Sequence, residues 1–202
     1  MRFSALAPVL LTLLVVVPAP SDAGSSSDDP VCLVIQHQER VDLEEMELEV
    51  QLARTRHRAA AQIFDLVDPL WKDEIIEEII HLTAKRDNDV AELQIERQAL
   101  LLRRQEALVD QLRILCSSSG SKQELQEAQR RYFKADCDRI GKDLAIARVD
   151  LAYLEAWLAS MVDLRANVAT KQDVIWAEHD VERARDEIAH RSRRFKACAD
   201  SP

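Results

Sequence analysis

Residues 137–161, CDRIGKDLAIARVDLAYLEAWLASM, carry apolar side chains at steps of three and four residues. These steps place the apolar side chains on one narrow stripe of an α-helix that packs against another helix. A second run with the same spacing lies between Leu43 and Trp71. The two stripes consist of Cys137, Ile140, Leu144, Ala147, Leu151, Leu154, Leu158 and Met161, and of Leu43, Met46, Val50, Ala53, His57, Ala60, Phe64, Val67 and Trp71. The sequence predicts an all-α fold: an elongated antiparallel helical bundle with coiled-coil-type seams.

Turn and capping signals divide the chain into four expected helices. Asp29–Pro30 has the pattern of an N-cap followed by proline at the first helical position, so the first helix should run from about Val31 to Val67. Asp68–Pro69 repeats this pattern and predicts a corner that starts the second helix, because the residue before a proline disfavours the helical conformation. A kinked continuous helix is the alternative. The second helix should continue to Cys116.

The clearest break in the sequence is Ser117–Gly120. Ser121 and Glu124 form a capping-box pattern that predicts a third helix, which should reach about Val168. Thr170 with Asp173 is a weaker box for a fourth helix that ends near Ala199. The second and third helices would each have ~48 residues and measure ~70 Å, which makes them a long central helical hairpin. The first and fourth helices are expected to fold back along it as neighbours in an up-down-up-down bundle.

The N-terminal residues have the pattern of an export signal. Arg2 precedes an apolar run from Leu6 to Val17, and small residues lead up to Ala23. We predict a cleavable signal peptide over residues 1–23, a flexible leader over 24–30 and a single helical-bundle domain over 31–199. An N-terminal membrane anchor is the alternative, but the run is shorter than the ~20 residues that a spanning helix needs. We expect no integral membrane segment after signal cleavage.

Four cysteines lie behind this signal, which predicts two disulfides in a secreted or periplasmic protein. Helix lengths bring Cys198 back to nearly the level of Cys137, which predicts a bond between these two residues. Cys32 and Cys116 would then pair by elimination, and this second pairing is the weaker prediction. A Cys116–Cys137 bond is disfavoured, because one helix would have to bridge its own length.

Two Glu-x-x-His patterns, Glu78/His81 and Glu187/His190, fall on the second and fourth helices. Pairs of such motifs hold two metals in ferritin-like bundles, where glutamates such as Glu49 and Glu155 would complete the site. However, the apolar face of the second helix centres on its isoleucines, and His81 points nearly opposite that face at about 100° per residue. We therefore expect both motifs on solvated faces, and we predict no metal, no cofactor and no catalytic residue.

His57 occupies a stripe position on the first helix. A histidine in a helix seam can act as a pH switch. The alternative is a hydrogen-bonded or edge-exposed residue that tunes the register of the helices.

Charge is distributed unevenly along the chain. The first helix is acidic and the end of the fourth is basic, so the two would complement each other if they were neighbours. The alternative is a basic patch that binds an anionic lipid or an acidic partner. The charged residues are Glu39, Asp42, Glu44, Glu45, Glu47 and Glu49, and Arg183, Arg185, Arg191, Arg193, Arg194 and Lys196. The formal net charge of −9 argues against a nucleic-acid partner.

These features favour an exported, non-enzymatic helical scaffold or partner-binding protein of the cell envelope or the extracellular space. A long helical face would bind a protein partner of unknown identity, around the polar middle of the second helix or at Ser117–Ser121. The same apolar stripes would also allow two copies of the chain to pair in a homodimer, and the sequence does not distinguish a homodimer from a complex with another protein. The alternative function is a periplasmic helical chaperone or stress-sensing protein, which needs an exposed concave apolar surface. A di-metal carboxylate bundle is a more remote alternative.

Overall fold

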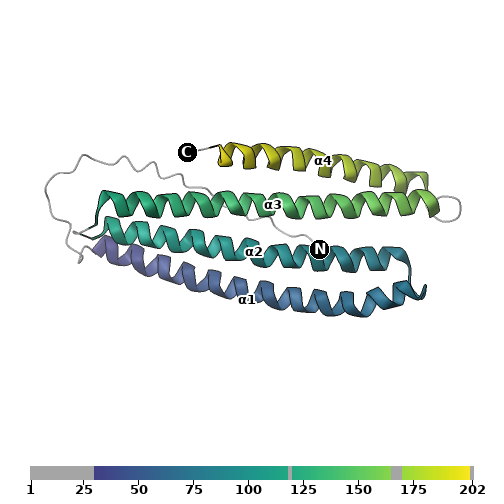
Figure 1. The fold of residues 1–202 in the computed structure, drawn as a ribbon, viewed down its shortest axis with the longest axis horizontal. Helices are drawn as coiled ribbons and strands as arrows, with labels where there is room; N and C mark the ends of the chain where they lie inside the picture. The colour runs from purple at the N-terminus through teal and green to yellow at the C-terminus, as the bar shows by residue number, and fades with distance from the viewer. Residues whose placement is uncertain (1–29, 118–119, 165–169, 201–202) are drawn as a thin grey trace.

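The computed structural model describes residues 30–117, 120–164 and 170–200, which form four α-helices and no strand. The helices are α1 (Pro30–Lys72), α2 (Glu78–Leu115), α3 (Lys122–Leu164) and α4 (Lys171–Ala199). They run antiparallel to their sequence neighbours and lie side by side along one long axis (Figure 1). The predicted all-α, elongated helical fold is therefore confirmed. The expected signal peptide and most of the leader fall outside the described residues.

The helices form one open layer. The backbone of α1 approaches that of α2, α2 approaches α3, and α3 approaches α4, whereas no other pair of these helices comes within 8 Å (Figure 1). The prediction that the first and fourth helices lie next to each other is thus wrong, because α1 and α4 form the two opposite edges of the layer. The acidic residues of α1 do not cover the basic residues of α4.

Small side chains occupy the contacts between adjacent helices. More than half of the buried apolar residues in the described chain are alanines, and no large side chain there is fully buried. Because interaxial distance depends on the side chains at the contact, alanine lets neighbouring helices approach closely. A closed bundle instead needs larger side chains to fill its centre. The buried alanines are Ala53, Ala84, Ala91, Ala107, Ala128, Ala135, Ala147 and Ala177.

Both predicted capping boxes are present. The amide of Glu124 donates to the hydroxyl of Ser121 at 3.1 Å, and the amide of Ser121 donates to the Glu124 carboxylate at 2.8 Å. Thr170 and Asp173 make the same reciprocal pair at 3.2 and 3.0 Å. The starts of α3 and α4 therefore follow from local hydrogen bonding that the sequence already specifies. The predicted third-helix end at Val168 lies outside the described residues.

The predicted corner at Asp68–Pro69 is wrong. Pro69 lies inside α1, which continues to Lys72, and the turn to α2 comes afterwards, with Glu74 at φ 58°. Two interactions support the helix across the proline. Lys72 Nζ donates to the Asp68 carboxylate at 2.5 Å. Trp71, the last residue of the apolar stripe on α1, stacks on His81 of α2. Consequently α2 starts later than expected and has 38 residues.

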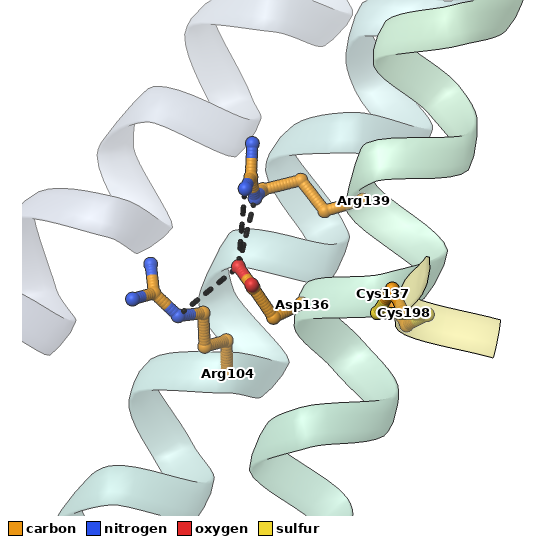
Figure 2. The surroundings of a disulfide bond; sticks show 5 residues. All are labelled: Arg104, Asp136, Cys137, Arg139 and Cys198. Atoms are coloured by element: carbon orange, nitrogen blue, oxygen red, sulfur yellow. Dashed lines mark hydrogen bonds and ion pairs between the residues drawn. A yellow bond between two sulfur atoms is a disulfide. The ribbon is translucent and has the colours of Figure 1, made fainter. Parts of the chain in front are cut away.

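Two disulfides tie the outer helices to the inner pair. Cys32 near the start of α1 bonds Cys116 just after α2, with Cα atoms 5.8 Å apart. Cys137 of α3 bonds Cys198 near the end of α4, with Cα atoms 5.7 Å apart (Figure 2). The first-named prediction, Cys137–Cys198, came from the helix levels, and the second, Cys32–Cys116, from elimination; both pairs lie at disulfide distance. Structural disulfides of this kind fit an oxidising compartment.

We predict that Cys137→Ser/Cys198→Ser loosens α4 selectively. This helix contacts α3 alone, and the bond closes a loop with a sequence separation of 61 residues, which is worth ~2–4 kcal/mol by chain entropy. Hydrogen exchange should become faster in residues 171–199 and stay nearly unchanged in α2. The matched control, Cys32→Ser/Cys116→Ser, should loosen α1 instead. Equal exchange changes in all four helices would contradict this nearest-neighbour arrangement.

Candidate functional site

The Glu-x-x-His residues do not converge. His81 is buried against the end of α1, whereas His190 is exposed on α4. Glu187 pairs with Arg191 at 2.5 Å, Glu155 pairs with Arg185 at 2.7 Å, and Glu49 is exposed. Among the described residues, no group of three or more His, Cys, Asp or Glu side chains is placed to hold a metal ion.

His81 is not on a solvated face, contrary to expectation. Its Nε2 atom lies 3.1 Å from Oδ1 of Asp68, and its ring stacks on Trp71 with centroids 4.2 Å apart and planes inclined by 8°. Phe64 adds a tilted ring contact at 5.7 Å. The helical wheel misplaced His81 because α2 begins only at Glu78, and because α1 extends beyond Pro69 and brings Trp71 over the imidazole. This His81 cluster joins α1 to α2 beside their turn.

Asp68 is the charged centre of the His81 cluster. Its pKa is held below the ordinary value, mainly by the hydrogen bond from Lys72 and further by the bond to His81. A carboxylate between an ammonium and an imidazole is a stable ion-pair arrangement. The side chains in contact include no hydroxyl or thiol nucleophile. The cluster can therefore fix the turn between α1 and α2.

His57 is half-buried on α1. Its ring makes no hydrogen bond, ion pair or ring contact with another residue in the described part of the chain. The seam-switch hypothesis for His57 stays a prediction.

Six large exposed apolar side chains lie at one end of the layer, distributed over all four helices and the turn after α1. α1 ends and α2 begins at the same end at which α3 ends and α4 begins (Figure 1). The two tryptophans there, Trp71 and Trp176, are 38% and 60% exposed. We call this region the tryptophan end, and it comprises Trp71, Ile75, Ile80, Val162, Ile175 and Trp176. Large exposed apolar groups, aromatic ones above all, are typical of surfaces that bind another molecule.

Sequence reasoning missed the tryptophan end, although part of its signal was present. Ile175 and Trp176 interrupt the polar face of the fourth helix, away from the stripe through Val174, Ala177 and Val181. The latter three residues are buried against α3, whereas Ile175 and Trp176 are exposed. Apolar residues off the stripe were therefore the useful signal.

The polar middle of α2, expected to bind a partner, is partly occupied by α3. The guanidinium of Arg86 bonds Asp150 through Nε at 2.8 Å and Nη2 at 2.7 Å, and lies over the Tyr153 ring. Further ion pairs continue along the same two helices, with Arg97 on Asp143 at 2.6 Å. These pairs fix α2 against α3 and leave fewer charged groups of α2 free for a partner.

The ion pairs reach the disulfide that anchors α4. Asp136, next to Cys137, accepts from Arg139 at 3.1 Å and lies 3.5 Å from Arg104 of α2 (Figure 2). One carboxylate therefore connects α2 with the segment of α3 that carries the disulfide. Gly141 of α3 also makes room for the Phe195 ring of α4, because a Cβ at this position would lie 3.0 Å from that ring.

The other expected binding region, Ser117–Ser121, borders a surface depression of about 510 Å³ lined mainly by charged side chains. Across it, Asp110 of α2 pairs with Arg131 of α3 at 3.1 Å. Ser118 and Ser119 lie outside the described residues. The charged lining makes this depression a weaker candidate for partner binding than the tryptophan end.

No protein-family model, curated protein or solved structure matches this chain. None of the described helices combines the length and apolar character required to cross a membrane.

We predict that His81→Ala destabilises the protein by ~1–2 kcal/mol, because it removes a part-buried hydrogen bond and a ring stack. Thermal unfolding followed by circular dichroism measures the effect. His190→Ala is the matched control, since it removes the exposed histidine of the other Glu-x-x-His pattern and should change stability by less than ~0.5 kcal/mol. Equal effects of the two variants would show that the His81 cluster does not stabilise the turn.

Asp68→Asn should destabilise the protein at pH 7, with the loss diminishing in acid. Asp68 has a lowered pKa in the folded state, so its stabilisation is present above the unfolded pKa of 3.8 and is lost as the pH falls through the folded value. Melting temperatures of wild type and variant should therefore converge below about pH 4. Asp65→Asn, an exposed position on the same helix, is the control. A difference that grows on acidification would contradict the assignment.

Proposed function

We propose that this chain is an exported, non-enzymatic helical scaffold that binds a protein partner through the tryptophan end. The observation that carries the proposal is that exposed tryptophan and isoleucine side chains occur where both helix pairs turn, at the same end of the layer. Tryptophan in particular is enriched among the side chains that dominate binding energy at protein interfaces.

Secretion or a periplasmic location is part of the same proposal. Two disulfides join described cysteines, and the first residues have the pattern of an export signal. Both features are typical of proteins that fold in an oxidising compartment. The bonds suit a scaffold, because they keep the outer helices attached when only one neighbour supports each of them.

The chaperone hypothesis gains support from one specific observation. A closed bundle would bury its apolar faces, but this layer leaves large apolar side chains exposed on α1 and at the tryptophan end. A chaperone would use such surfaces for many unfolded clients, whereas a scaffold would bind one folded partner.

Trp176→Ser tests the proposal. The immobilised, disulfide-intact protein is incubated with extracellular and envelope extracts of the source cells, and bound proteins are identified by mass spectrometry. One dominant partner should be retained by wild type and by Phe133→Ser, an exposed aromatic position on α3, and lost at least tenfold with Trp176→Ser.

Suppression of the aggregation of a reduced, unfolded substrate separates the two functions. A broad client set together with suppressed aggregation would favour the chaperone over the scaffold. Retention of the same partner by Trp176→Ser would show that the tryptophan end is not the binding surface. The absence of both partner and chaperone activity would contradict the proposed function.

A further inference from the structure

The outer edge of α1 carries a second apolar stripe, separate from the one that faces α2. Leu48 and Leu66 on it are 70% and 71% exposed, and α1 has no helix beside it on that side in the described layer. At ~100° per residue this stripe lies roughly a third of a turn around α1 from the buried positions Val50 and Ala53. We call it the outer stripe, and it consists of Val34, Gln38, Val41, Glu45, Leu48, Leu52, Arg56, Ala59, Ile63, Leu66 and Leu70, all exposed.

The outer stripe has the same spacing in both directions from Leu52. Steps of three and four residues follow in the same order towards Val34 and towards Leu70. Val41 and Ile63 are equidistant from Leu52, as are Glu45 and Ala59. A helix with this pattern matches a second copy of itself when the two run antiparallel about Leu52, because every stripe position then meets another stripe position.

The charges beside the outer stripe are also arranged in complementary halves. Glu49 precedes Leu52 by three residues, and Arg56 follows it by four. Both side chains are exposed, and neither pairs with an opposite charge within the described part of the chain. At ~100° per residue both lie close to the line of the outer stripe, so an antiparallel pair brings Glu49 near Arg56 of the second copy. A parallel pair would instead set like charges against each other.

We propose that α1 is a self-association surface through which two copies of this chain form a two-fold antiparallel dimer centred on Leu52. The dimer would join two open layers edge to edge into one broad layer, with α4 of each copy at the outside. It buries the apolar side chains that the monomer leaves exposed on α1. The dimer can be tested apart from the proposed function, because Leu48 and Leu52 lie in the middle of α1, whereas Trp176 lies on α4 at the far edge of each layer.

Sedimentation equilibrium of the full disulfide-bonded chain tests the dimer. Wild type should show a concentration-dependent dimer, and Leu48→Glu/Leu52→Glu should raise its Kd roughly 100-fold or more, because each chain loses two buried leucines and gains like charges. Ile175→Glu, an exposed isoleucine on α4, is the matched control and should leave Kd unchanged. Because both sets of positions are exposed, circular dichroism should show the same helix content for all three proteins.

Charge exchange supplies an independent readout. Glu49→Lys and Arg56→Glu should each weaken self-association alone and should form a mixed dimer when combined. Orientation follows from a nitroxide attached at Arg40→Cys, where the antiparallel pair predicts a label separation of roughly 35 Å from helix rise, and a parallel pair one below about 20 Å.

Three outcomes would overturn the proposal. These are a monomeric wild type at all concentrations, a dimer that Leu48→Glu/Leu52→Glu does not weaken, and a short label separation at residue 40. Failure of dimer formation with partner binding retained at the tryptophan end would leave the proposed function intact, so the two proposals fail separately.

Discussion

Each helix of this protein is held by its neighbour in sequence, because the contacts between helices are made through small side chains in a single layer. Alanines such as Ala107 and Ala128 let α2 and α3 approach closely, and no central core draws α1 and α4 together. Each edge helix therefore packs against one neighbouring helix, whereas each inner helix packs against two. The disulfides Cys32–Cys116 and Cys137–Cys198 compensate for this by fixing the free ends of α1 and α4.

The open layer also explains the distribution of polar interactions. The inner pair α2 and α3 carries the ion pairs of Arg86, Arg97 and Arg104 with aspartates across the contact. These pairs are partly exposed and contribute modestly to stability, but they favour one register between the two helices. At the edge, the His81 cluster fixes α1 to α2 through a stack and a carboxylate hydrogen bond. Apolar groups without a neighbouring helix remain exposed, which connects the architecture to both proposed binding surfaces.

Several features were predictable from the sequence because their causes are local or depend on helix length. The capping boxes at Ser121 and Thr170 each need only residues within one turn. Helix rise assigned similar levels to Cys137 and Cys198, and the pairing of Cys32 with Cys116 then followed by elimination. Pro69 was harder to place, because proline permits both a corner and a continued helix. The decision rested on Lys72 and Trp71, whose contacts with Asp68 and His81 support the last turn of α1.

The sequence by itself determined the helical class, the starts of α3 and α4 and the Cys137–Cys198 pair, since periodicity, capping and rise per residue act along one chain segment. Tertiary structure alone decided that α1 and α4 lie at opposite edges, that His81 is buried and that the tryptophans share one end. Which helices become neighbours depends on how closely the surfaces of two helices can approach each other. Buried alanines control that approach, yet they stand out little in a hydrophobic pattern that also contains exposed residues such as Leu48 and Leu66.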